Sequence, residues 1–126
     1  VQALFETCGE ADEVFSEDHL NYLTGLVGTG PSYPALLAQA LFNNALDQGL
    51  PEAVARRAAA GVVAHASQLI NEERGFDQLL DTLIAYRGVS AAGIQGMKDA
   101  GFDACVKAGL DDAMAVARSN LFKPGE

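Results

Sequence analysis

The segment from Pro51 to about Asn71 constrains the fold of this chain more than any other. Five of its apolar residues recur at intervals of four: Val54, Ala58, Val62, Ala66 and Ile70. This spacing predicts an amphipathic helix, and Ala55, Ala59 and Val63 beside it make the apolar stripe unusually wide. A helix that is apolar over most of its circumference is normally buried on several sides. We therefore expect a central helix whose burial is shared with a second copy, in a homodimer.

Apolar residues also recur at helical spacing along most of the remaining chain. The pattern predicts further helices from Ser16, after Pro31 as far as Gly49, around Phe76, after Gly88 and from about 103 to 121. Residues 16–126 are therefore expected to form an all-α bundle of about six helices. Residues 11–15 are assigned to an edge strand.

Charge and cysteine usage exclude several classes of function. The 126 residues carry 8 Lys and Arg against 17 Asp and Glu, a net charge of −9. Nucleic acids and anionic membrane surfaces require clustered basic residues, so neither is an expected partner. Cys8 and Cys105 have no histidine companions at ligand spacing, which predicts no metal site and indicates reduced thiols in a cytoplasmic protein. No apolar run is long enough to span a membrane.

The loop from Arg87 to Ser90 is the strongest candidate binding site. Gly88 permits a turn with positive φ, and the N–H groups of Ser90, Ala91 and Ala92 would then be free at a helix start. Free N–H groups and the helix dipole favour a carboxylate or phosphate. The guanidinium of Arg87 could add a forked contact. The plainer interpretation is that Ser90 caps its own helix and that Arg87 is solvated.

The turn Gly28-Thr29-Gly30 superficially resembles a dinucleotide-binding loop. That motif requires a preceding strand and a third glycine, and Tyr33 stands where the third glycine would fall. We interpret the turn as a break between two helices. No cofactor is therefore expected to bind to this chain alone.

Several segments, together with the alanine-rich helix, match signatures of a known family: Leu26–Tyr33, Gly49–Glu52, Ala92–Ile94, Ala100–Phe102 and Ala117–Ser119. The first of them is similar to the family pattern ALSGSGPAY. The chain thus resembles the C-terminal domain of pyrroline-5-carboxylate reductase. The resemblance implies a bundle like the C-terminal domain of 6-phosphogluconate dehydrogenase, in an interlocked dimer. It also implies that residues 1–15 end an N-terminal nucleotide-binding domain and that residues 16–126 form the dimerisation and substrate-side domain.

The same resemblance implies an activity, the NAD(P)H-dependent reduction of a cyclic imine carboxylate in proline biosynthesis. NADP or NAD would bind to the absent domain, and this chain alone would be inactive, with no catalytic or metal-binding residue of its own. The substrate carboxylate would rest on the loop that the family writes as SPGGTT, here residues 85–90, which retains Gly88 and Ser90 but has Arg87 and Val89 at substituted positions. Glu73 would lie near the ring nitrogen of the substrate or near the cofactor. The alternative is a non-catalytic oligomerisation module that has lost its substrate loop.

Overall fold

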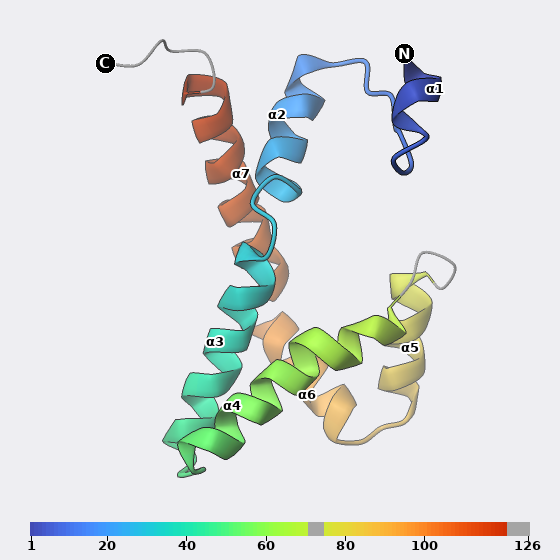
Figure 1. Cartoon of the computed structure of the whole chain (residues 1–126). Coiled ribbons are helices and arrows are strands. Elements are labelled where there is room, and N and C mark those ends of the chain that lie inside the picture. Colours follow the sequence, from blue (N-terminus) through green and yellow to red (C-terminus); the bar gives the residue numbers. More distant parts are fainter. Residues whose placement is uncertain (71–74, 121–126) are drawn as a thin grey trace. The chain divides into compact units, whose positions relative to one another are not determined.

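The computed structural model describes residues 1–70 and 75–120, most of which are helical (Figure 1). The α-helices are α1 (Gln2–Phe5), α2 (Glu17–Leu26), α3 (Ser32–Asp47), α4 (Glu52–Ala60), α5 (Phe76–Ala85), α6 (Val89–Asp99) and α7 (Phe102–Asn120). A π-helical segment η1 (Gly61–His65) and a 3₁₀ turn η2 (Ala66–Leu69) follow α4. No strand occurs in the described residues, and the all-α class is confirmed.

The edge strand expected at residues 11–15 is wrong. The segment has no regular secondary structure, and the side chain of Phe15 is 88% exposed. A strand requires a neighbouring strand for its hydrogen bonds. The described part of the chain contains no second strand, so the alternation around Val14 and Phe15 is insufficient to form one.

Helix α3 ends at the predicted glycine. Gly49 has φ +84°, and its N–H donates to the carbonyl of Leu46 at 2.8 Å. The N–H of Leu50 donates to the carbonyl of Ala45 at 3.1 Å. These two bonds form a Schellman motif, which requires a left-handed residue and therefore favours glycine at this position.

The chain divides into two compact units, Val1–Gly28 with Val106–Glu126, and Thr29–Cys105. In the first unit, α2 packs against the C-terminal part of α7. A Cβ added at Gly25 would lie 2.9 Å from the Cβ of Ala113, so a glycine is needed for this close approach. Asn21 in α2 and Ala117 in α7 are also buried, and they lie about one helical turn from Gly25 and Ala113, respectively.

In the second unit, α4 packs against α3. Ala55 and Ala59 are the buried residues of α4. The guanidinium of Arg56 lies 4.9 Å from the centroid of the Phe42 ring, and its Nη2 is 2.6 Å from Oε1 of Glu52. The cation–π contact therefore links α3 with α4, while the ion pair steadies the arginine along α4.

The helix predicted from Pro51 to about Asn71 is present as far as Leu69, but its winding changes. Residues Gly61–His65 follow the i→i+5 pattern of a π-helix and the next four form a 3₁₀ turn. Gly61 and the two β-branched residues after it are weaker α-helix formers than the alanines of α4, which is consistent with a change of winding at this point. Asn71 lies outside the described residues.

The expectation that this helix is buried on several sides is met on one side only. Ala55 and Ala59 are buried, whereas Val54 is 41% and Val62 is 53% exposed. No large side chain among the described residues is fully buried. Much of the predicted apolar stripe therefore remains exposed to solvent.

Candidate functional site

The candidate loop joins α5 to α6, and its backbone differs from the prediction. The positive φ lies at Arg87, at +47°, whereas Gly88 is extended with φ −132° and ψ −151°. The prediction of a positive φ at Gly88 is therefore wrong. The N–H of Arg87 donates to the carbonyl of Ile84 at 3.1 Å, which closes α5 with a left-handed residue before Gly88 starts α6. A non-glycine residue in this conformation is strained by about 1–2 kcal/mol.

Three backbone N–H groups at the start of α6 have no hydrogen-bond partner among the described residues. The first helical bond of α6 runs from the N–H of Ala92 to the carbonyl of Gly88 at 3.1 Å. The free donors are therefore those of Val89, Ser90 and Ala91, one residue earlier than predicted, and the expectation for Ala92 is wrong. Gly88 is the N-cap, and no side chain caps this helix. The interpretation of Ser90 as the cap of its own helix is therefore also wrong.

The start of α6 is open to solvent. Gly88 and Ser90 are exposed, and Val89 is 92% exposed. The helix dipole places partial positive charge at these N–H groups, and Arg87 adds a full charge next to them in sequence. Arg87 forms no ion pair within the described chain. The arrangement can therefore accept a small carboxylate or phosphate by charge-assisted hydrogen bonds.

Glu73 belongs to residues 71–74, which lie outside the described residues. Its assignment to the neighbourhood of the substrate ring nitrogen or of the cofactor stays a prediction. The other four predicted site residues all lie at the start of α6: Arg87, Gly88, Val89 and Ser90.

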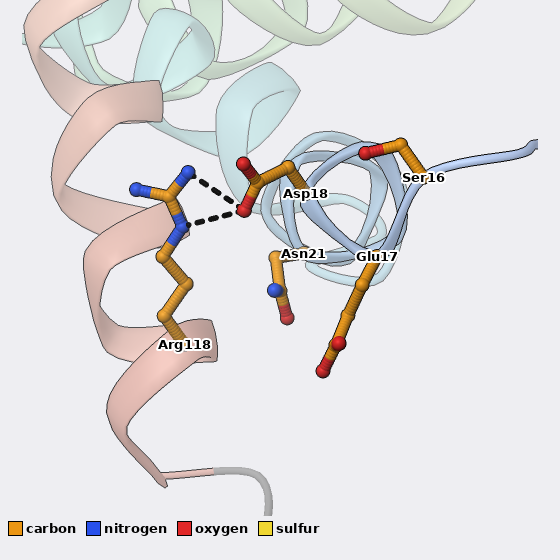
Figure 2. A pocket seen from close by; sticks show the side chains of 5 residues that line it. All are labelled: Ser16, Glu17, Asp18, Asn21 and Arg118. Atoms are coloured by element: carbon orange, nitrogen blue, oxygen red, sulfur yellow. Dashed lines mark hydrogen bonds and ion pairs between the residues drawn. The ribbon is translucent and has the colours of Figure 1, made fainter.

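A polar hollow in the first unit was missed by the sequence reasoning. It is lined by Ser16, Glu17, Asp18, Asn21 and Arg118 (Figure 2). Nη2 and Nε of Arg118 lie 2.9 and 3.1 Å from Oδ1 of Asp18. These two residues are 100 positions apart, so no local spacing connects them. The available signal was the i, i+3, i+7 spacing of Asp18, Asn21 and Gly25, which places them on one face of α2.

The cysteines and the one described lysine with a shifted pKa lie outside both of these sites. Cys8 and Cys105 are free and exposed. No helix in the described residues is long and apolar enough to cross a membrane. The pKa of Lys107 is raised because its ammonium donates a hydrogen bond to Asp111 one turn along α7 and is attracted by that carboxylate. This pair lies in neither the loop nor the hollow.

The glycines at 28 and 30 do not form a nucleotide-binding loop. They lie in the turn that follows α2, and Ser32 begins α3 directly after it. A dinucleotide loop follows a strand, whereas a helix precedes this turn. The described residues therefore do not fit a nicotinamide dinucleotide at this turn.

The family model described as "Pyrroline-5-carboxylate reductase dimerisation" matches residues 17–120. The chain belongs to this family. Pyrroline-5-carboxylate reductase from Synechocystis is 32% identical over 106 residues, which are 83% of this chain and 39% of that protein. Pyrroline-5-carboxylate reductase 3 from Macaca fascicularis is 29% identical over 119 residues, 94% of this chain and 43% of that protein.

A solved structure shows a related fold. The crystal structure of Plasmodium falciparum pyrroline carboxylate reductase with NADP bound aligns with a TM-score of 0.74 at 19% identity, over 94% of this chain and 45% of that one. The chain thus spans less than half the length of these relatives.

The family resemblance predicted from the motifs is confirmed. The matched region of the pyrroline-5-carboxylate reductase dimerisation family includes the loop before α6 and four of the five residues of the hollow, all except Ser16. The assignment of residues 1–15 to an upstream nucleotide-binding domain stays a prediction.

Proposed function

We propose that this chain is the dimerisation and substrate-side domain of a pyrroline-5-carboxylate reductase-like oxidoreductase. The loop from Arg87 to Ser90 binds the carboxylate of a small substrate, a cyclic imine carboxylate of the proline biosynthesis type. The supporting observation is the exposed row of free N–H groups at the start of α6. The relatives are reductases by name, which gives the class of reaction.

This chain contributes binding and orientation rather than a reacting group. The free N–H groups at the N-terminus of α6, those of Val89, Ser90 and Ala91, donate hydrogen bonds to the carboxylate. Arg87 neutralises part of the charge of that carboxylate. Fixing the carboxylate restricts the position of the ring that it belongs to, which is how orientation lowers a barrier. NADP or NAD belongs to the rest of the parent protein, because the turn at 28–30 does not fit it. The isolated chain is inactive.

The chain also acts as a homodimer in this proposal. The exposed apolar residues after Pro51, including Val54 and Val62, form a face that a second copy would cover. The family description names dimerisation. The free, exposed cysteines suit a reducing compartment, and we assign the protein to the cytoplasm.

Replacing Val89 by proline tests the carboxylate site. Proline at the first helical position removes one N–H donor but keeps the helix, because its fixed φ suits that position and Gly88 is already extended. We expect L-proline, used as a product-like carboxylate, to shift the amide resonances of Ser90 and Ala91 in the wild-type chain. In Val89→Pro the affinity should fall by about tenfold, since a hydrogen bond to a charged group is lost.

Prolinamide is the control ligand, because it has the same ring without the carboxylate. It should leave the Ser90 and Ala91 resonances unchanged. Equal affinities of Val89→Pro and wild-type for L-proline would contradict the site. No shift with L-proline or other small carboxylates at saturation would favour the second function, an oligomerisation module without a substrate loop.

A further inference from the structure

A buried amide side chain without a partner lies between α2 and α7. Asn21 is only 9% exposed and is the one buried polar residue among those described. Its carboxamide forms no hydrogen bond within the described chain. No unpaired side-chain N or O atom in this part of the chain is completely enclosed, so the carboxamide retains some access to solvent. Because Asn21 lines the hollow, that access is through the hollow.

The other residues of the hollow determine which group it can hold. Arg118 and Asp18 neutralise each other in an ion pair, which leaves the carboxylate of Glu17 as the uncompensated charge. In Figure 2 the carboxamide of Asn21 and the carboxylate of Glu17 point to the same side of α2. An amide oxygen and a carboxylate both accept hydrogen bonds, so together they suit a donor with positive charge.

The cation that fits is organic rather than metallic. No group of three or more metal-ligating side chains comes together in the described residues. An ammonium or guanidinium group needs fewer partners, because each N–H bonds one acceptor. A lysine or arginine side chain therefore matches the hollow in charge and in hydrogen bonding.

We propose that the hollow receives a basic side chain from a second copy of this chain, so that the site around Asn21 is complete only in the dimer. This inference rests on the proposed homodimer. Apart from Arg87, which is assigned to the substrate carboxylate, two basic side chains form no ion pair within the described chain, so a second copy has cations to supply: Arg57 and Lys98. Two copies with a net charge of −9 repel each other, and a cation in an acidic hollow offsets that repulsion at one place. The contact would also set the register of the two copies.

The test measures the dimer dissociation constant of the 126-residue chain by sedimentation at about 50 and about 500 mM salt. Asn21→Ala should weaken the dimer by about tenfold, because a buried donor from the second copy loses its acceptor. The same change should leave α2 as stable or more stable, since alanine is the better helix former. Glu17→Gln should weaken the dimer by about fivefold at low salt and reduce its dependence on salt.

Matched controls carry the same substitutions outside the hollow. Asn44→Ala on α3 and Glu13→Gln should stay within about twofold of wild-type. If the wild-type chain dimerises and both Asn21→Ala and Glu17→Gln also stay within about twofold, water alone satisfies Asn21 and this inference is overturned, while the homodimer stands. A wild-type chain that remains a monomer at about 100 µM would overturn the homodimer and this inference together.

Discussion

Replacing Gly25 by valine is expected to destabilise the α2–α7 pair by about 2–3 kcal/mol. The Cβ alone would lie 2.9 Å from the Cβ of Ala113, closer than nonbonded carbon atoms normally approach. The two methyl groups of valine would add to this overlap and force the helices apart. Because Asn21 and Ala117 are buried in the same pair, the separation would expose them as well. Urea denaturation followed by circular dichroism at fixed protein concentration measures the loss.

Gly109→Val is the matched control. Gly109 also lies in α7, and a Cβ added there meets nothing within 4 Å. Valine has a slightly higher helix propensity than glycine, so the free energy of unfolding should change by less than about 0.5 kcal/mol. Similar losses in Gly25→Val and Gly109→Val would show that the close approach of α2 to α7 is not needed.

Introducing aspartates at Val54 and Val62 together is expected to weaken the dimer at least about 100-fold, which is about 2.7 kcal/mol. Both side chains are substantially exposed in the single chain, so the charges remain hydrated in the monomer. In a dimer that covers this face, the same carboxylates would lose their hydration without gaining a partner, and that cost falls on the dimer alone. Sedimentation across a concentration series measures the dissociation constant, and circular dichroism checks that helicity is retained.

Ala60→Asp provides the control on α4. Ala60 is exposed but lies away from Val54 around the helix. It should leave the dissociation constant unchanged. A dimer that survives the double substitution would place the interface elsewhere. Loss of helicity in the monomer would instead show that the face is packed within the chain.

The helical architecture was accessible from the sequence because helix formation depends on neighbours three and four residues apart. The apolar stripe that includes Val54 and Val62 depends on such local relations, and so does the helix-ending glycine at 49. In the structure both valines lie in helical turns, and α3 ends just before Gly49. The winding change at Gly61 was not predicted. Apolar spacing alone does not distinguish a π-helical segment from an α-helical one over a few residues.

The loop was predicted at the right place between two helices, but the positive φ was assigned to Gly88 rather than to Arg87. Glycine tolerates positive φ at no cost, and Gly88 was therefore the natural choice. The structure places Arg87 in that conformation instead, two residues after the end of α5 at Ala85. Gly88 is the N-cap and Val89 begins α6, so the free N–H groups are those of residues 89–91 rather than 90–92.

By itself, the sequence determined the all-α class, most helix boundaries, the acidic character and the family. Each of these depends on composition or on patterns that repeat within a turn or two of helix. Tertiary structure alone decided that Arg118 pairs with Asp18, that Asn21 is buried, and that Gly25 meets Ala113. These contacts join α2 to α7 across most of the chain length, and no local periodicity encodes which helical faces meet at such a separation.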